Sequence, residues 1–323
     1  MVGISGRSSG APAAGGRIGV VGSNMVDLVT YIDRMPEAGE TLAAPSFSMG
    51  HGGKGANQAV AAARLGGDVM LVSRVGDDLF GEGTIRNFQD IGIDARHVRA
   101  VPGTQSGVAP IFVDPSGENR ILIVKGANEH LLPADVEAAE EDLRRCSLIL
   151  LQLEVPLETV YHTIDWAARE GIEVLLNPAP ATPELDVGRI LAATFLVPNQ
   201  TELAIMTGLP TGTRGEAERA ARVLVEKGIR TVIVTLGAEG ALLVTAEMVR
   251  HVPPVPVRPR DTSGAGDAFI GAFAQHYVGS RDIEAAMAWA AAYAADSITR
   301  PGTQKAFADA KGFEAFRASL PRP

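Results

Sequence analysis

Short apolar runs recur along the chain and alternate with longer, alanine-rich segments. The runs place Val, Leu and Ile at consecutive positions, which is typical of strands that are buried on both faces. The longer segments repeat their apolar positions with the period of a helix. The predicted strands are residues 18–21, 69–72, 148–151, 174–176, 195–197 and 231–235, and the clearest predicted helices are 56–65, 156–170 and 215–227. This alternation predicts an α/β fold with a doubly wound, mostly parallel sheet flanked by helices.

Two stretches interrupt the alternation. Residues 41–50 and 107–124 have the pattern of strands with turns at 50–53 and 114–117, and no helix of the usual length accompanies them. We expect the segments at about 41–53 and 107–124 to form a small β-sheet lid over the site. A pair of hairpins at the edge of the main sheet is the alternative that the pattern leaves open.

The length and composition favour one large domain with a small appendage. The chain has 323 residues, of which 46% are apolar. Residues 1–17 are rich in Gly, Ala and Ser and carry Arg7 and Arg17 as their only charges, so we expect a disordered tail rather than a transit peptide. The folded domain is expected over residues 18–316, followed by a C-terminal tail at 317–323.

The charge balance narrows the choice of partners. With 29 basic and 38 acidic side chains the net charge is −9, which disfavours binding to nucleic acid and to anionic membranes. No apolar run approaches the roughly 20 residues needed to cross a bilayer. Cys146 is the only cysteine, so no intrachain disulfide can form, and a reducing compartment such as the cytoplasm is expected. Its apolar neighbours predict a buried, structural thiol.

A turn of small residues precedes an apolar helical stretch near the C-terminus. Residues 261–269 read Asp-Thr-Ser-Gly-Ala-Gly-Asp-Ala-Phe. The backbone N–H groups of Gly264, Ala265 and Gly266 can approach an anion closely, and the helix that they open adds a partial positive charge. Asp267 beside them can accept the proton of an attacking hydroxyl, which phosphoryl transfer to an alcohol requires. An ordinary capped helix after a Gly-rich turn is the alternative.

A second glycine-rich loop lies at residues 52–58. It is not the phosphate loop of common NTPases, because Gly55 follows Lys54 where Ser or Thr is required. Gly53 and Gly55 allow a ligand to approach the backbone, while Lys54 and Asn57 offer donors and an acceptor. This set of groups suits a polyhydroxylated ligand.

The segment that follows the first predicted strand, residues 22–27, lacks the third glycine of the dinucleotide fingerprint. This disfavours a nicotinamide-dependent dehydrogenase. Asp27 is expected at the carboxyl end of that buried strand, where it can accept hydrogen bonds from vicinal hydroxyls. A capping role is the alternative.

The two glycine-containing motifs resemble the signatures of the ribokinase-like (PfkB) sugar kinases, and the similarity extends from residue 18 to about residue 304. The resemblance implies an ATP-dependent kinase in which Asp267 is the base and Mg²⁺ bridges the donor phosphates. It also implies that the lid closes on the sugar and pairs with the lid of a second subunit, giving a homodimer. The sugar-binding residues implied are Asp27, Gly53, Lys54, Gly55, Asn57, Glu154 and Asp267.

The resemblance also implies a nucleotide site. Asn199 and Glu202 match a motif that helps to position magnesium and phosphates, although the same pair is typical of a capping box. Thr235, Gly237 and Gly240 match a turn that lines the nucleotide, together with Gly266. Ala291 stands where a residue that contacts the adenine edge is often His or Asn.

A monovalent cation site is implied as well. Asp261, Ser263, Ser297, Arg300 and Gly302 match positions that hold an activating K⁺ in ribokinases, mostly through carbonyl oxygens. Ala306 stands where a Ser often contributes. Asn24 and Met25 differ from the residues of most ribokinases, so the resemblance assigns them no role.

The sequence therefore predicts an ATP-dependent kinase that phosphorylates the 5-hydroxyl of D-ribose and releases ADP. A kinase of the same family acting on deoxyribose, fructose or a nucleoside is the nearest alternative. A sugar-binding regulator without catalytic activity is the alternative from another class, and the intact Asp267 and its glycine-rich turn disfavour it.

Overall fold

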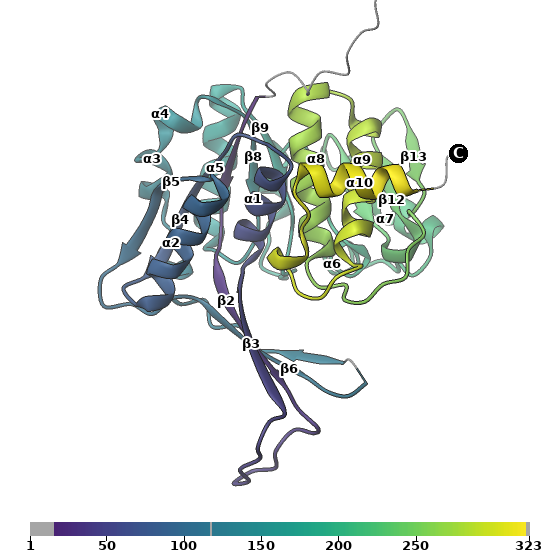
Figure 1. Ribbon diagram of the computed structural model, residues 1–323. Helices are drawn as coiled ribbons and strands as arrows, with labels where there is room; N and C mark the ends of the chain where they lie inside the picture. The colour runs from purple at the N-terminus through teal and green to yellow at the C-terminus, as the bar shows by residue number, and fades with distance from the viewer. Residues whose placement is uncertain (1–15, 117, 321–323) are drawn as a thin grey trace, which may run out of the picture.

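A nine-stranded sheet forms the centre of the molecule, in a computed structural model that describes residues 16–116 and 118–320. The strand order is β13-β12-β11-β10-β9-β8-β1-β4-β5, and all neighbouring pairs are parallel except β11/β12 and β12/β13. Its strands are β1 (Arg17–Val21), β4 (Val69–Gly76), β5 (Asp94–Val101), β8 (Cys146–Leu151), β9 (Glu173–Leu176), β10 (Phe195–Leu196), β11 (Val232–Thr235), β12 (Ala241–Val244) and β13 (Val249–Val252). The predicted doubly wound, mostly parallel sheet is confirmed (Figure 1).

Helices cover both faces of this sheet (Figure 1). They are α1 (Lys54–Arg64), α2 (Leu79–Ile91), α3 (Pro133–Glu137), α4 (Glu140–Leu143), α5 (Leu157–Glu170), α6 (Gln200–Thr207), α7 (Arg214–Glu226), α8 (Ala265–Ser280), α9 (Ile283–Ser297) and α10 (Ala310–Ser319). Short 3-10 helices are η1 (Gly126–His130), η2 (Val187–Ile190), η3 (Gly237–Glu239) and η4 (Gln304–Ala306). Helix α10 extends past the boundary expected at residue 316, and of the predicted N-terminal tail only Gly16 and Arg17 lie within the described residues.

Strand β8 shows why the strands read as continuous apolar runs. Leu148 and Leu150 belong to the core on one face, which contains side chains of α1, α8 and α9. Ile149 and Leu151 belong to the core on the other face, which contains side chains of α5 and α7. Successive side chains of a strand point to opposite faces, so a strand between two helical layers must be apolar at every position.

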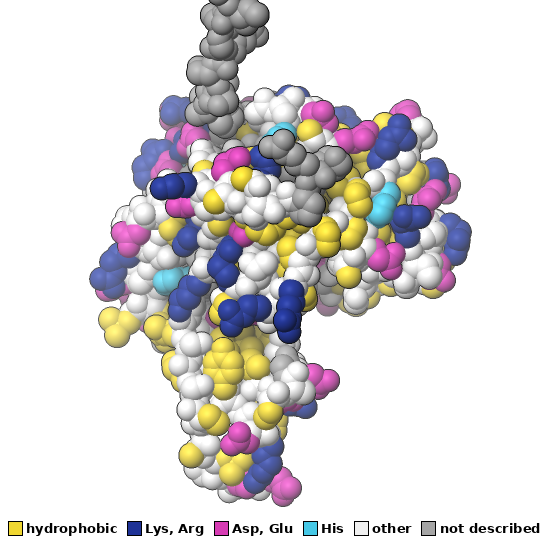
Figure 2. Space-filling view, turned by 45° about the vertical axis from the view of Figure 1, so that its right-hand side comes forward, with side chains coloured by type: hydrophobic (Ala, Val, Ile, Leu, Met, Phe, Trp, Pro, Cys, Tyr) yellow, Lys and Arg dark blue, Asp and Glu magenta, His cyan; other side chains and the backbone are white. Residues whose placement is uncertain are grey.

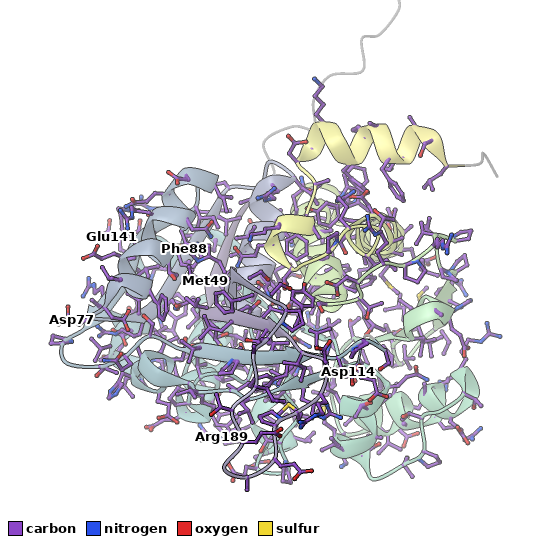
Figure 3. All side chains as sticks on the ribbon, turned by 60° about the horizontal axis from the view of Figure 1, so that its bottom comes forward. Met49, Asp77, Phe88, Asp114, Glu141 and Arg189 are labelled. Carbon is purple, nitrogen blue, oxygen red and sulfur yellow. The ribbon has the colours of Figure 1, made fainter. Side chains whose placement is uncertain are left out.

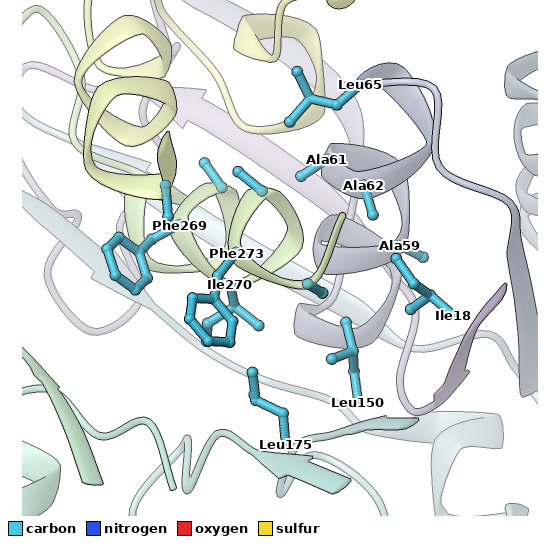
Figure 4. Close-up of a cluster of buried hydrophobic side chains, with 14 of the residues drawn as sticks. Ile18, Ala59, Ala61, Ala62, Leu65, Leu150, Leu175, Phe269, Ile270 and Phe273 are labelled. Atoms are coloured by element: carbon cyan, nitrogen blue, oxygen red, sulfur yellow. The ribbon is translucent and has the colours of Figure 1, made fainter. Parts of the chain in front are cut away.

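Helices α1 and α8 approach each other closely because small residues line their contact (Figure 4). A Cβ atom on Gly271 of α8 would lie 2.6 Å from the Cβ of Ala61 and 2.4 Å from the backbone oxygen of Gln58 on α1. Figure 4 shows Ala61 and Ala62 of α1 facing the α8 side chains Ile270 and Phe273 above Leu150. This packing brings the N-terminal turns of the two helices, which carry Asn57 and Asp267, to one place.

A separate small sheet projects from the large domain (Figure 1). Its order is β3-β2-β6-β7, from β2 (Met25–Tyr31), β3 (Ser46–Gly52), β6 (Val108–Val113) and β7 (Asn119–Ile121). Both predicted lid segments contribute to it. The sequence prediction was wrong about Asp27, which lies within β2 of the small sheet and not at the end of the buried strand β1. Residues 50–52 continue β3, so the turn predicted there is replaced by the start of α1 after Gly53.

Within the described ranges, no helix is both long enough and apolar enough to span a bilayer. Cys146 is buried, and burial raises the pKa of its thiol to about 12. A thiol with so high a pKa stays protonated and unreactive at neutral pH, which fits the structural role expected for it.

Candidate active site

A cavity of about 180 Å³ opens where three helices begin. Helix α1 starts at Lys54, α6 at Gln200 and α8 at Ala265, and residues at all three starts line the cavity. It lies beyond the carboxyl ends of β10 and β11, the usual ligand edge of an open α/β sheet. Three helix N-termini facing one space favour an anionic ligand. The side chains that line the cavity include those of Lys54, Asn177, Asn199, Glu202, Thr235, Thr262, Ala265, Asp267 and Ile270.

The turn before α8 is shaped as the sequence predicts. Gly264 caps the helix with φ +72°, a left-handed conformation that favours glycine, and a Cβ atom there would lie 2.4 Å from Cγ2 of Thr303. The N–H of Ala265 donates to the carbonyl of Thr262 at 3.2 Å, so an anion in the cavity would rely mainly on the neighbouring amides. Gly264, Ala265 and Gly266 all line the cavity.

Asp267 lies on the first turn of α8 and is buried. Its Oδ2 accepts a hydrogen bond from Nδ2 of Asn57, and its Oδ1 accepts one from Nε2 of Gln58, both at 3.0 Å. These donors fix the orientation of the carboxylate. Each carboxylate oxygen keeps a further lone pair, so the group can still accept a proton from a bound hydroxyl.

Two further carboxylates lie near Asp267. Glu154, beyond the end of β8, accepts hydrogen bonds from Oγ of Ser23 at 2.5 Å and from the backbone N–H of Lys54 at 2.8 Å. Burial raises its pKa. Burial and the charge of Glu154 raise the pKa of Asp27 to about 6, and Oγ1 of Thr303 lies 3.5 Å from Oδ2 of Asp27.

Lys54 faces these acids. Burial alone would lower the pKa of its ammonium group, but the charges of Asp267, Glu154 and Glu202 outweigh burial and raise it. Since Lys54 also lines the cavity with Glu202, it lies between the residues predicted to bind a sugar and those predicted to bind a nucleotide.

The backbone around residue 53 joins the two loops of the predicted sugar site. Gly53 has φ +87°, and a Cβ atom on it would lie within 2.6 to 2.7 Å of the backbone of Asn24 and Met25. Any other residue would push the loops apart. Gly55 contacts the backbone of Ser23 in the same way. The structure therefore brings together Gly53, Lys54, Gly55, Asn57, Glu154 and Asp267 as the sequence predicts.

Asn199 and Glu202 form the capping box that the sequence left as an alternative. Asn199 Oδ1 accepts from the N–H of Glu202, and the two oxygens of Glu202 accept from the N–H and Nδ2 of Asn199, all at 2.8 Å. Thr235 pairs with Asn199 through an isolated bridge and lines the cavity, whereas Gly237 opens the following η3 and Gly240 caps it. A hard carboxylate already held by two N–H groups suits contact with a magnesium ion through water.

The residues predicted to hold a monovalent cation lie on two loops that hydrogen bonds join, except Ser297, which ends α9. Asp261 accepts from the N–H of Ser263 at 2.9 Å and from the N–H of Gly302 at 2.8 Å. The side chain of Arg300 is committed to Asp296 and to the carbonyl of Ala306, so only its backbone carbonyl is available to a cation. Ser297 donates to the carbonyl of Ala294. In the described part of the chain, no three His, Cys, Asp or Glu side chains are grouped to hold a metal.

Several buried amides beside Asp267 were not singled out from the sequence. They are Gln58, Gln152, Asn177 and Gln304. Gln58 ends the glycine-rich motif and Gln152 precedes Glu154 by two positions, so proximity in sequence was a usable signal for both. Gln304 offered no such signal, because its partner Asn57 lies 247 positions away.

Comparison with known proteins agrees with this geometry. The model of the pfkB family of carbohydrate kinases matches residues 16–310. A deoxyribokinase of Salmonella typhi is 54% identical over 299 residues, which are 93% of this chain and 98% of that protein. A ribokinase of Bacillus subtilis is 39% identical, covering 88% of this chain and 94% of that protein. The structure of Arabidopsis thaliana ribokinase complexed with ribose and ATP superposes with a TM-score of 0.87 at 30% identity, covering 94% of this chain and 98% of that one.

Proposed function

This chain belongs to the pfkB family of carbohydrate kinases, and we propose that it is an ATP-dependent deoxyribokinase that phosphorylates the 5-hydroxyl of 2-deoxy-D-ribose and releases ADP. We keep the carbohydrate kinase predicted from the sequence but propose 2-deoxy-D-ribose in place of D-ribose as the substrate. The greater identity to a deoxyribokinase, 54% against 39% for a ribokinase, supports this choice.

Met25 is the observation in this chain that carries the proposal. Met25 and Asp27 are two positions apart in β2, so they share one face of the strand. Oδ2 of Asp27 lies 3.5 Å from Oγ1 of Thr303 in the large domain, and this contact supports the proposal that the face is turned to the sugar. The cross-strand partners of Met25 and Asp27 are Gly52 and Gly50. The carboxylate of Asp27 lies over Gly52, where a Cβ atom would come within 2.2 Å of its Oδ1, whereas the space beside Gly50 is open.

Met25 is buried, so a sugar carbon beside it would lie against an apolar surface. A hydroxyl on that carbon would lose its hydrogen bonds to water and gain none, at a cost of roughly 1–3 kcal/mol. A carbon without a hydroxyl pays no such cost. We therefore place carbon 2 of the sugar near Met25, where 2-deoxyribose is preferred to ribose.

The proposed mechanism assigns one task to each group. Asp267 accepts the proton of the 5-hydroxyl, and Asp27, Glu154 and Asn57 with the backbone at Gly53 and Gly55 hold the other hydroxyls. The amides at Gly264 and Gly266, on either side of Ala265, and the ammonium group of Lys54 stabilise charge on the phosphoryl group in transit. Asn199, Glu202, Thr235, Gly237 and Gly240 are the proposed contacts of ATP.

Two ions belong to the proposal. A bound Mg²⁺ would neutralise the donor phosphates, and Glu202 with Asn199 would hold it through water. K⁺ would bind carboxylate and carbonyl oxygens of the loops at Asp261, Ser263, Ser297, Arg300 and Gly302. The hydrogen bonds between these loops support the K⁺ proposal, because they bring the proposed ligands together beside the turn that opens α8.

The small sheet is proposed to act as a lid and as the contact of a homodimer. Phe47 and Met49 on β3 are 60% and 50% exposed, and the space-filling view shows apolar side chains over this projecting sheet (Figure 2). A paired lid would bury them. The free thiol of Cys146 suits the reducing cytoplasm, where we propose that the enzyme acts.

A screen of ADP release over 2-deoxyribose, ribose, fructose and nucleosides tests the reaction. The proposal expects the highest kcat/KM with 2-deoxyribose, a requirement for Mg²⁺ and a higher rate with K⁺. If none of the sugars in the screen raises ADP release above background, the protein binds sugar without kinase activity and the proposal is contradicted.

The variant Met25→Asn tests the specificity argument. An amide at this position can pair with a hydroxyl, so the ratio of kcat/KM for 2-deoxyribose over ribose should fall by about tenfold or more. Met35→Asn makes the same chemical change in the exposed connection between β2 and β3 and should leave the ratio unchanged. An unchanged ratio in Met25→Asn would remove Met25 from substrate selection.

A further inference from the structure

Both oxygens of Asp267 are held by chains of side-chain amides. Asn87 donates to Oε1 of Gln304 at 3.1 Å, Gln304 donates to Oδ1 of Asn57 at 3.0 Å, and Asn57 donates to Asp267. On the other side, Gln152 donates to Oε1 of Gln58 at 2.6 Å, and Gln58 donates to Asp267. In both chains each of these hydrogen bonds is donated in the direction of the carboxylate, and Nε2 of Gln58 also donates to Oδ1 of Asn177 at 3.2 Å.

The direction of these hydrogen bonds matters because a primary amide can turn by 180° and exchange its donor for its acceptor. The orientation of a buried amide is therefore set by its partners. For Asn57, two partners require the same orientation: Asp267 accepts from its nitrogen, and Gln304 donates to its oxygen. Because Nε2 of Gln304 donates to the oxygen of Asn57, the nitrogen of Asn57 is left facing Asp267.

Gln304 is itself held firmly in place. It is 5% exposed and opens η4, whose neighbours contact several parts of the proposed site. The N–H of Gly302 donates to Asp261, Thr303 reaches Asp27, and Nζ of Lys305 donates to the backbone oxygen of Met49 on the lid strand β3. Figure 3, viewed from the lid end, shows where Met49 lies on the small sheet. Contacts on both sides of Gln304 keep its side chain aimed at Asn57.

We propose that Gln304 is a positioning residue for the phosphoryl transfer: it acts through Asn57 to keep a hydrogen-bond donor on Oδ2 of Asp267. The inference rests on the proposed function, since it concerns the residue proposed as the base. It adds to the residues that serve the reaction one that lies outside both glycine-rich motifs in the sequence.

Two substitutions separate this role from simple packing. Gln304→Glu keeps the size of the side chain but replaces the donor with an acceptor, so residue 304 and Asp267 compete for the one NH2 group of Asn57 and the hydrogen bond to Asp267 is weakened. Gln304→Met keeps the approximate volume and leaves Asn57 free to turn either way. A hydrogen bond to a charged group is worth about 1.5–3 kcal/mol, so kcat should fall by about tenfold or more, and by more in Gln304→Glu than in Gln304→Met.

The experiment measures kcat, KM for sugar and KM for ATP in the full-length protein, with Gln275→Met as the matched control. In the described part of the chain, Oε1 of Gln275 on α8 has no hydrogen-bond partner, so its loss should leave kcat within about twofold of the wild type. The proposal also expects KM for ATP to stay within about twofold in the Gln304 variants, because their effect is on the base. A purely structural role would lower the melting temperature and leave kcat of the folded fraction unchanged.

Failure of this inference can be told apart from failure of the proposed function. Wild-type kcat in a folded Gln304→Met variant overturns the inference, and this variant decides the question if Gln304→Glu does not fold. If Asp267→Asn is inactive in the same assay, the proposed function survives that result. Full activity of Asp267→Asn would overturn both.

Discussion

The two sheets of this protein bury their apolar side chains to different extents. In the nine-stranded sheet, Leu148 and Ile149 are adjacent on β8 and both are completely buried, one on each face. In the four-stranded sheet, Phe47 and Met49 on β3 are largely exposed, and their strand neighbours Gly50 and Gly52 face the polar site. The large sheet obtains stability from its apolar residues, whereas the small sheet leaves Phe47 and Met49 as exposed apolar surface.

This difference teaches where the protein can tolerate change. The large sheet is fixed by packing on two sides, so it positions the starts of α1, α6 and α8 rigidly. The small sheet carries Met25 and Asp27 on β2, which is buried at Met25 and exposed at Tyr31. Under the proposed function, this sheet moves as a lid and selects the substrate without unfolding the core.

Phe273→Ala should have the largest effect on stability. Phe273 packs edge-on to Phe195 and stacks on Tyr277, with ring centroids 5.4 and 5.6 Å apart. Removing this fully buried ring should lower the free energy of unfolding by about 3–5 kcal/mol. Denaturant unfolding followed by circular dichroism measures the loss, and a change below about 1 kcal/mol would contradict the account of the core.

Asp267→Asn should damage catalysis while leaving the core intact. Asparagine keeps the shape of the side chain but cannot accept the proton, so kcat should fall by at least about a hundredfold, or roughly 3 kcal/mol in activation free energy. Sugar binding, measured by calorimetry, should change little. An unchanged kcat would remove Asp267 from the mechanism.

Asp27→Asn should weaken sugar binding and raise the free energy of unfolding at pH 8. The pKa of Asp27 is about 6 in the folded chain against 3.8 when exposed, so stability falls as pH rises between these values while the buried carboxyl loses its proton. At pH 8 the variant should be more stable than the wild type by about 2 kcal/mol, less than the full shift implies because solvent still reaches the group. Melting temperatures at pH 4 and pH 8 measure this effect.

The same substitution gives a second readout. Ionised Asp27 accepts hydrogen bonds from sugar hydroxyls, so in the wild type KM for the sugar should rise as pH falls below about 6. In Asp27→Asn, KM for the sugar should no longer rise with the protonation of this group. If the variant is less stable than the wild type at pH 8, the burial of an ionised Asp27 is not the cause of its raised pKa.

Phe47→Ser should have the smallest effect on the stability of the large domain, within about 0.5 kcal/mol, because the ring is 60% exposed. It should nevertheless weaken the proposed homodimer. Light scattering coupled to size exclusion compares the masses of variant and wild type. A wild-type protein that is monomeric at high concentration would contradict pairing through the lid.

The comparison also shows what could be predicted from sequence. Strand β8 was predictable because burial on both faces leaves no polar position. The turn before α8 was predictable because its residues are contiguous in the sequence. Strand β5 (Asp94–Val101) was missed because an edge strand can carry charged residues such as Arg96 and Arg99. Strand β2 was missed because its residues belong to a sheet assembled from distant segments.

Side-chain pairs that are far apart in the chain could not be read from local pattern. Asn57 and Gln304 meet only because α1, α8 and η4 pack together, and single-sequence patterns carry no record of that contact. The proposed preference between two sugars likewise rests on Met25, whose position was known only once β2 was seen to pair with β3 across Gly52.

Competition between 2-deoxyribose and ribose tests the central claim most directly. With both sugars at equal concentration, ATP and Mg²⁺, the ratio of the two sugar phosphates measured by mass spectrometry gives the ratio of kcat/KM values. The account predicts that deoxyribose 5-phosphate predominates and that Met25→Asn reduces the excess. Predominance of ribose 5-phosphate in the wild type would contradict it.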